Sequence, residues 1–218
     1  MTITLVPPAR VCYNCRRNEV MTTMKLIAGL GNPGEKYDLT RHNVGWHAID
    51  ELARLLESRV YVNRSSGLTG TAYYEGEKLL LVKPLTYMNL SGECIAPLAA
   101  YYKLAPEDVL VLCDDVNLPL GQLRIRKGGS AGGHTGLKNI IERLGSDQFP
   151  RIRIGVGPQP DGMDLVEFVL RTMSAGERKE AAAAEERAAK AALLAVKNGL
   201  GAAMNEYNQR IRPDGEKL

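Results

Sequence analysis

An asparagine and a histidine stand close together in a segment whose glycines shape the backbone. Residues 29–45 read GLGNPGEKYDLTRHNVG and contain Asn32 in a glycine-rich turn, followed by His42. The turn comes directly after residues 25–28, which favour a β-strand. Glycine allows positive φ and lets a ligand approach the backbone closely. Because ligands bind at the carboxyl ends of strands in open α/β sheets, we expect an amide and a titratable imidazole at one site.

His42 is the strongest candidate for acid–base chemistry. A neutral imidazole near pH 7 can take a proton from water, and it then needs an acceptor that fixes its tautomer and stabilises the imidazolium. Asp114 is the natural partner because it ends the apolar run 108–112. Asp115 would project to the other side of an extended chain. A histidine at a helix start also serves as a cap or a core residue, and the nearby Asn32 turn favours the catalytic interpretation.

Two uncharged amides, Asn32 and Asn89, stand in or beside predicted turns. Asparagine often caps the local backbone in such places. An amide can also donate to a carbonyl or a developing oxyanion without competing for the catalytic proton. We expect Tyr37 and Met88 to line the same cleft, although both residue types also suit an ordinary core or rim.

The glycines of the first turn match the dinucleotide fingerprint only formally. That motif, Gly29-x-Gly31-x-x-Gly34 here, needs a helix that opens directly from the third glycine. Pro33 and residues 35–40 separate the turn from the predicted helix, and no strand ending in an acidic residue stands at the expected distance. A nicotinamide or flavin site is therefore disfavoured.

A second glycine-rich stretch, GGSAG at residues 128–132, matches the nucleophile motif G-x-S-x-G. His134 follows Ser130 too closely for an acid on a separate strand to intervene, as the α/β-hydrolase order requires. A His42–Asp114–Ser130 triad would be permissible in another fold. We favour a flexible loop that covers the site, with a serine esterase as the alternative.

Composition narrows the class of protein. The chain has 218 residues, 44% of them hydrophobic, which suits one domain or at most two small ones. It has no apolar run of membrane-spanning length and no charged-then-apolar signal pattern at its N-terminus, so we expect a cytoplasmic protein.

The four cysteines do not suggest a disulfide framework in a chain of this length. Cys94 and Cys113 suit a reduced core. The Cys12–Cys15 pair lacks a second ligand pair for zinc and the βαβ context of a redox motif. We expect residues 1–23 to be a disordered extension, with Met21 or Met24 as the true start.

Strands and helices alternate along the predicted domain. Apolar residues at helical spacing or high helix propensity predict helices at residues 47–56, 90–102, 135–144 and 176–204. Strands are predicted at residues 69–74, 78–82, 108–112, 122–126 and 151–156, with a hairpin turn at 75–77. This order implies an α/β fold, a single-domain three-layer sandwich in which a twisted mixed β-sheet carries helices on both faces. We place the domain at residues 24–206 and a C-terminal tail at 207–218.

Positive charge is concentrated in one part of the chain. The net charge is only +3, but basic residues far outnumber acidic ones between residues 121 and 153. The basic residues are Arg124, Arg126, Lys127, Lys138, Arg143, Arg151 and Arg153. Phosphate binding needs such local clustering more than a high overall charge. The alternative is a solvated face on scattered elements.

Four segments, in this order, resemble the bacterial peptidyl-tRNA hydrolase family. They are residues 31–43 (GNPGEKYDLTRHN), 84–92 (PLTYMNLSG), 114–121 (DDVNLPLG) and 132–138 (GGHTGLK). The resemblance runs from about Met24 to the C-terminal helix. It implies a monomeric esterase that frees tRNA from peptidyl-tRNA with activated water, and it requires no metal, no cofactor and no covalent nucleophile.

The resemblance also implies a role for individual residues. His42 would activate water and Asp114 would orient His42, which selects Asp114 over Asp115. Substrate-binding positions would be Asn32, Tyr37, Met88, Asn89, His134 and Thr135. The positions implied for gripping tRNA phosphates are Arg126 and Arg153, extended by Lys127, and arginine can do this bidentately.

Thr135 departs from the family pattern, in which an asparagine follows this histidine. Threonine keeps a hydroxyl donor and acceptor but lacks the geometry of an amide. We therefore expect slower or altered turnover rather than none. An RNA-binding relative that has lost catalysis is the alternative that Thr135 favours, and the intact His42 and Asp114 argue against it.

Overall fold

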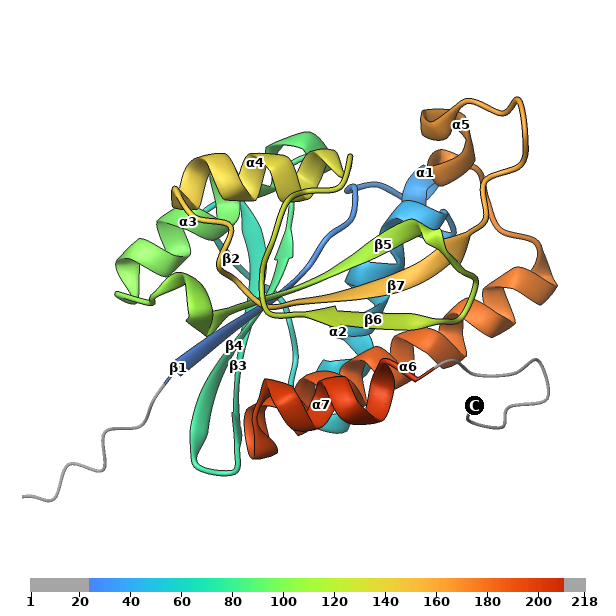
Figure 1. Ribbon diagram of the computed structural model, residues 1–218. Coiled ribbons are helices and arrows are strands. Elements are labelled where there is room, and N and C mark those ends of the chain that lie inside the picture. The colour runs from blue at the N-terminus through green and yellow to red at the C-terminus, as the bar shows by residue number, and fades with distance from the viewer. Residues whose placement is uncertain (1–23, 210–218) are drawn as a thin grey trace, which may run out of the picture.

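A seven-stranded mixed sheet runs through the molecule in the computed structural model, which describes residues 24–209 (Figure 1). The strands are β1 (Met24–Gly29), β2 (Val62–Arg64), β3 (Gly67–Tyr74), β4 (Glu77–Pro84), β5 (Val109–Pro119), β6 (Leu123–Arg126) and β7 (Arg151–Gly157). Their order in the sheet is β2-β3-β4-β1-β5-β7-β6. β1 pairs in parallel with β4 and β5, and β5 pairs in parallel with β7, whereas the other three pairs are antiparallel.

Helices cover both faces of this sheet. The α-helices are α1 (Glu35–Asp38), α2 (Val44–Leu55), α3 (Ser91–Tyr101), α4 (Thr135–Leu144), α5 (Leu165–Leu170), α6 (Ala175–Asn198) and α7 (Leu200–Tyr207). Short 3₁₀ helices are η1 (Arg41–Asn43), η2 (Met88–Leu90) and η3 (Pro106–Asp108). Helices α2, α6 and α7 lie on one face of the sheet and α3 and α4 on the other (Figure 1). One core cluster joins the sheet to the first group, and a second joins it to the second group. The predicted α/β sandwich with a mixed sheet is therefore confirmed.

The central strand β1 shows how the sequence divides the core. Ile27 belongs to the cluster on the α2 side, while Leu26 and Ala28 belong to the cluster on the α3 side, and all three are fully buried. Successive side chains of a strand point to opposite faces, so a continuous apolar run is what a strand covered on both faces requires.

Two glycines bring the start of α2 onto the carboxyl ends of the central strands. A Cβ on Gly29 would lie 2.0 Å from the carbonyl oxygen of Gly45, and a Cβ on Gly45 would lie 2.5 Å from the carbonyl oxygen of Leu112. No larger residue fits at such distances. The close approach places η1, which directly precedes α2, above the ends of β1 and β5.

Several predicted boundaries were wrong. The predicted helix 176–204 is two helices, because Gly199 with φ 85° ends α6 before α7 begins. The strand predicted at 108–112 continues to Pro119, since Asp114 and Asp115 still pair with β7. β2 and α5 were not predicted. Both are short, and β2 is exposed throughout, so neither carries an apolar period.

The last residues that the structure describes lie against the edge of the sheet at β6. Tyr207 ends α7, and Asn208 covers the free edge of β6. The amide of Asn208 accepts from the Ile125 N–H at 2.6 Å and donates to the Ile125 carbonyl at 3.1 Å. These two bonds pair the backbone N–H and carbonyl of Ile125, which an edge strand would otherwise leave unpaired.

Cys94 and Cys113 are free and buried, as predicted, and burial raises the pKa of each thiol to about 12. Cys12, Cys15 and the expected N-terminal extension 1–23 lie outside the described residues. Within residues 24–209, no helix has the length and apolar character needed to cross a membrane.

Candidate active site

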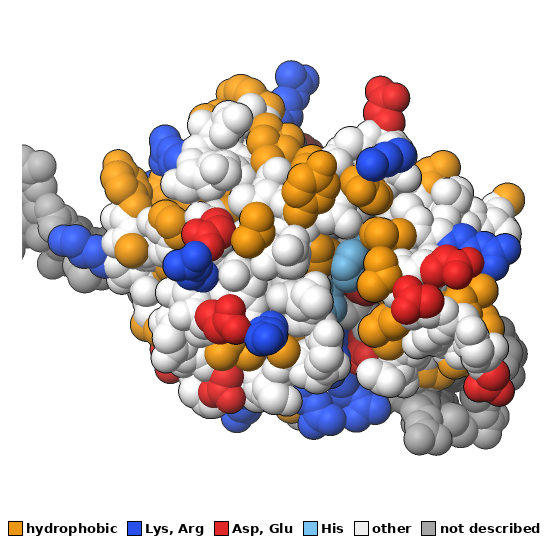
Figure 2. All heavy atoms as spheres, turned by 90° about the horizontal axis from the view of Figure 1, so that it is seen from above, with side chains coloured by type: hydrophobic (Ala, Val, Ile, Leu, Met, Phe, Trp, Pro, Cys, Tyr) orange, Lys and Arg blue, Asp and Glu red, His pale blue; other side chains and the backbone are white. Residues whose placement is uncertain are grey.

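A cleft of about 610 Å³ opens above the carboxyl ends of β1 and β5. It is lined by nine of the residues singled out from the sequence, namely Asn32, Tyr37, His42, Met88, Asn89, Asp114, His134, Thr135 and Arg153. Figure 2 shows histidine side chains inside this hollow, with hydrophobic side chains around its mouth and a group of Lys and Arg side chains at one end. Arg126 and Lys127 do not line the cleft and lie exposed at and just beyond the end of β6.

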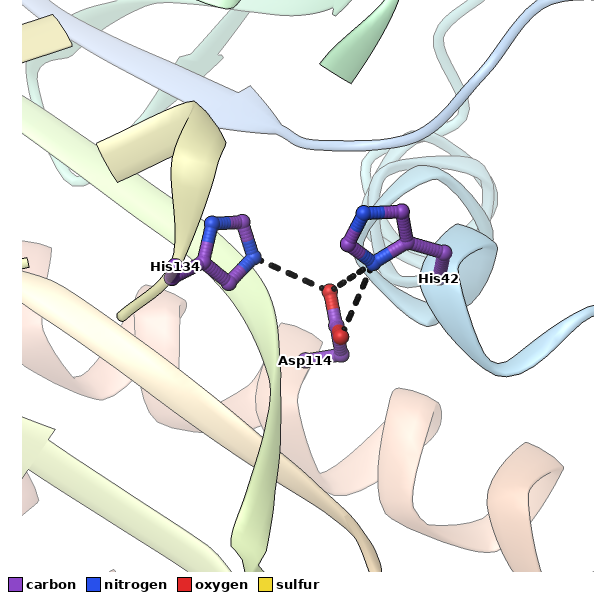
Figure 3. A group of neighbouring side chains, drawn as sticks. All are labelled: His42, Asp114 and His134. Carbon is purple, nitrogen blue, oxygen red and sulfur yellow. Dashed lines mark hydrogen bonds and ion pairs between the residues drawn. The ribbon is translucent and has the colours of Figure 1, made fainter. Parts of the chain in front are cut away.

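His42 and Asp114 form the expected pair. Nδ1 of His42 lies 2.9 Å from both carboxylate oxygens of Asp114 (Figure 3). Asp114 is only 2% exposed on the central strand β5, and His42 reaches it from η1. Since an ionised carboxylate only accepts, Nδ1 carries the proton and Nε2 is left as an acceptor.

The two groups shift the pKa of each other in opposite directions. Burial alone would lower the pKa of His42, but the charge and hydrogen bond of Asp114 outweigh it, so the pKa of His42 is raised above its usual value. Burial would raise the pKa of Asp114, and the two neighbouring imidazoles overcome this, so that pKa is lowered. Asp114 therefore stays ionised at neutral pH and supports a charged His42.

His134 also binds Asp114, which the sequence did not indicate. Nε2 of His134 lies 3.0 Å from Oδ1 of Asp114 (Figure 3). Its other nitrogen, Nδ1, accepts the backbone N–H of Leu137 at 3.3 Å and so caps helix α4. A backbone N–H can only donate, so the imidazole proton is on Nε2 and is donated to Asp114. The Asp114 carboxylate thus accepts hydrogen bonds from the N–H groups of two imidazoles, and the predicted contact of His134 with substrate would be additional.

The same three side chains could in principle hold a metal, because their donor atoms lie within 4.8 Å of one another. A cation at Nε2 of His134 would force the imidazole proton onto Nδ1. Nδ1 already accepts the Leu137 N–H, so that tautomer would lose the helix cap. The hydrogen bonds of the cluster therefore favour proton transfer over metal binding.

The orientation of Asn32 is fixed by its neighbours. Oδ1 of Asn32 accepts the backbone N–H of Met88 at 2.8 Å, which leaves the NH₂ group to donate within the cleft. Asn43 holds the backbone of Asn32 by two bonds, accepting its N–H at 2.9 Å and donating to its carbonyl at 3.0 Å. Asn43 was missed because an asparagine beside His42 carries no signal of its own. Asn43 is only 1% exposed, so its side chain supports the Asn32 turn from within the protein.

The remaining cleft residues differ in burial. Met88 is buried against the start of α4, while Asn89 and Thr135 are exposed to solvent. Tyr37 forms an edge-to-face pair with Tyr87, with ring centroids 6.4 Å apart. Tyr87 also lines the cleft, although its place in the sequence did not indicate this.

Arg153 reaches the cleft from β7 and is held there by Asp115. Nε of Arg153 lies 3.1 Å from Oδ2 of Asp115, so the two adjacent aspartates serve different partners on opposite sides of β5. Neither Arg143 nor Arg151 is a free cation. Arg143 pairs with Glu93, and Arg151 is buried and donates to the carbonyls of the glycine-rich loop. The basic run of the sequence is therefore partly structural.

Neither the G-x-S-x-G match at residues 128–132 nor the dinucleotide fingerprint at residues 29–34 has the geometry that its function requires. Ser130 is not a lining residue of the cleft, and no hydrogen bond in the described part of the chain joins it to a histidine. Its carbonyl accepts from Arg151 at 3.2 Å. After Gly34 only the one-turn helix α1 opens, and the long helix α2 begins later, at Val44.

Comparison with known proteins agrees with this geometry. The family model described as peptidyl-tRNA hydrolase matches residues 26–214. The peptidyl-tRNA hydrolase of Bacillus subtilis is 47% identical over 188 residues, which are 86% of this chain and all of that protein. That of Geobacillus kaustophilus is 48% identical over 186 residues, 85% of this chain and all of that protein. The crystal structure of peptidyl-tRNA hydrolase from Acinetobacter baumannii superposes with a TM-score of 0.80 at 33% identity, covering 86% of this chain and 95% of that one. This chain belongs to the peptidyl-tRNA hydrolase family.

Proposed function

We propose that this chain hydrolyses the ester bond between the peptide and the tRNA of peptidyl-tRNA, which releases free tRNA for reuse in translation. The observation that carries the proposal is the His42–Asp114 pair, at 2.9 Å, in a cleft that also presents the NH₂ group of Asn32. Membership of the family supports the same reaction.

In this mechanism Nε2 of His42 takes a proton from a water molecule as the water oxygen attacks the ester carbonyl carbon. The carbonyl electron pair moves onto oxygen, where the Asn32 amide donates to the developing charge. Asp114 stabilises the imidazolium. When the tetrahedral intermediate collapses, the bond to the ribose oxygen breaks, and His42 returns the proton to that oxygen. An ester is reactive enough for this route without a covalent nucleophile.

Asn89, on the exposed turn η2, would contact the peptide backbone, with Tyr37, Met88, His134 and Thr135 around the same substrate. Arg126, Lys127 and Arg153 would hold phosphates of the tRNA acceptor stem. Discrimination against free aminoacyl-tRNA follows if the cleft desolvates the α-amino position, because burying an unpaired ammonium is costly while burying a neutral amide is not. We also propose that the protein acts as a monomer in the cytoplasm.

The proposal is tested by release of a labelled N-acetyl-aminoacyl residue from its tRNA, with unblocked aminoacyl-tRNA measured alongside. Wild type should cleave the blocked substrate only, and Ser130→Ala should cleave it at the same rate. Loss of activity in Ser130→Ala would favour a serine esterase. A wild type that binds tRNA and cleaves nothing would instead identify an RNA-binding relative.

Replacing Arg126 and Lys127 together with glutamine should raise KM for the blocked tRNA substrate and leave kcat unchanged. Both side chains are exposed at the end of β6 and outside the cleft, so they can contact phosphate without touching the ester. Removing about two phosphate contacts should also flatten the dependence of log KM on log salt by roughly 2. An unchanged salt slope would show that the tRNA follows another path.

Thr135→Asn should raise kcat/KM by about two- to tenfold, the value of one added hydrogen bond. Thr135 opens α4 at the cleft, where an amide reaches further than a hydroxyl. Thr135→Val, which keeps the shape and removes the hydroxyl, is the matched control and should be slower than wild type. A slower Thr135→Asn enzyme would mean that this chain has adapted to threonine.

A further inference from the structure

Arg41 is a buried charged residue that the proposed reaction does not use. It precedes His42 in η1, and its side chain is only 7% exposed. It does not line the catalytic cleft but a second hollow of about 490 Å³, whose walls come mainly from the end of β7 with the segment after it and from the segment between α5 and α6. A buried guanidinium needs partners to offset its desolvation, and those partners show what the residue holds together.

The guanidinium of Arg41 contacts three separate parts of the chain beyond residue 167. Its Nη2 forms an ion pair with Glu177 near the start of α6. Its Nη1 donates to the Arg171 carbonyl at 3.3 Å, directly after α5. Its Cζ lies 4.5 Å from the ring centroid of Phe168, which is buried in α5. One side chain therefore binds the turn that carries His42 to both helices.

Backbone contacts run beside this side chain. Thr40 forms an antiparallel bridge with Thr172, and the Met173 N–H donates to the Leu39 carbonyl at 3.0 Å. The segment before His42 and the segment after α5 thus lie side by side. The turn at residues 40–43 contacts three walls of the cleft, since Arg41 holds α5, His42 binds Asp114 and Asn43 holds Asn32.

The helix held in this way forms the apolar wall of the cleft. Leu165, Val166, Val169 and Leu170 of α5 all line it. Two of them, Leu165 and Val166, stay largely exposed at the rim. A helix of six residues has too few internal hydrogen bonds to fix its own position, so its attachments decide where the wall stands.

We propose that Arg41 is a positioning residue that fixes the α5 wall of the cleft relative to His42. The inference rests on the proposed function, because the wall then contacts the peptide part of the substrate. Loosening α5 weakens that contact and raises KM. It leaves the His42–Asp114 pair intact, because none of the Arg41 contacts involves Asp114.

Glu177→Gln is the sharpest test. A glutamine at this position still completes the capping box with Ser174, since glutamine serves there as well as glutamate, so only the ion pair to Arg41 is lost. Glu186→Gln is the matched control, because it removes the exposed ion pair to Lys190 on the same helix. Arg41→Gln removes all three contacts. Arg41→Lys keeps the positive charge but lacks the two Nη groups with which the guanidinium binds Glu177 and the Arg171 carbonyl.

Cleavage of N-acetyl-aminoacyl-tRNA should show a KM raised roughly two- to fivefold in Glu177→Gln and about tenfold in Arg41→Gln. Arg41→Lys should fall between wild type and Arg41→Gln, and Glu186→Gln should match wild type. Backbone amides of α5 should exchange hydrogen faster in Glu177→Gln than in Glu186→Gln. Glu177 is 36% exposed, so this variant tests the proposal even if Arg41→Gln does not fold.

The inference is overturned if KM or the exchange of the α5 amides in Glu177→Gln equals that of wild type. It is also overturned if the acid limb of the pH profile moves upward in Arg41→Gln or downward in Glu177→Gln, because loss of a nearby cation would raise the pKa of His42 and loss of a nearby anion would lower it. A wild type that cleaves no substrate refutes the proposed function instead, while hydrogen exchange still reports whether Arg41 holds α5.

Discussion

His42→Ala is expected to lower kcat/KM for N-acetyl-aminoacyl-tRNA by about 10²–10⁴-fold, the usual contribution of a general base. His42 is the cleft imidazole with a ring nitrogen, Nε2, free to accept a proton, because the ring proton of His134 is committed to Asp114. KM should change little, since a water molecule can occupy the space of the ring. Initial rates measured over a range of substrate concentrations separate kcat from KM.

His47→Ala is the matched control for this variant. His47 is the remaining histidine among the described residues, lies on α2 outside the cleft, and contacts the Asp38 carbonyl with its ring. It should retain wild-type kcat/KM. If His42→Ala kept more than a tenth of the wild-type rate, another group would have to activate the water.

The sequence was sufficient to predict the parts of the site that each lie within one local segment. The glycine-rich turn after β1, the apolar run of β5 that leads to Asp114 and the helix that follows His134 were all identified from short-range patterns. Asp114 and His42 could be paired because the carboxyl ends of neighbouring parallel strands meet at one edge of a sheet. Nine of the eleven predicted site residues line one cleft.

Most of the contacts that were missed join segments far apart in the chain. His134 reaches Asp114, and Arg41 reaches Glu177, through pairings that only the assembled fold defines. Asn43 has no distinctive sequence context, and its role is defined by the bond that its amide donates to the Asn32 carbonyl. The sequence also did not show that Arg151 is a structural residue, because its guanidinium binds carbonyls of the two loops that flank α4.

Asp114→Asn is expected to lower kcat/KM about as severely as His42→Ala, by roughly 10²–10⁴-fold. Asparagine has nearly the same shape, but its NH₂ group cannot accept the Nδ1 proton of His42. The amide therefore favours the opposite tautomer, with the proton on Nε2, which is the nitrogen that has to take a proton from water. Asp115→Asn is the adjacent control, and it should affect KM through Arg153 while leaving kcat near wild type.

The pH profile of Asp114→Asn distinguishes this explanation from a general loss of structure. In wild type the carboxylate raises the pKa of His42 above its usual value, so kcat/KM falls as pH drops through that raised pKa. Without the carboxylate, burial remains and lowers the pKa of His42. The acid limb of the residual activity should therefore lie at lower pH than in wild type. The plateau value of kcat/KM is itself far below that of wild type. An acid limb that stays in place or moves upward would show that Asp114 does not set the pKa of the catalytic base.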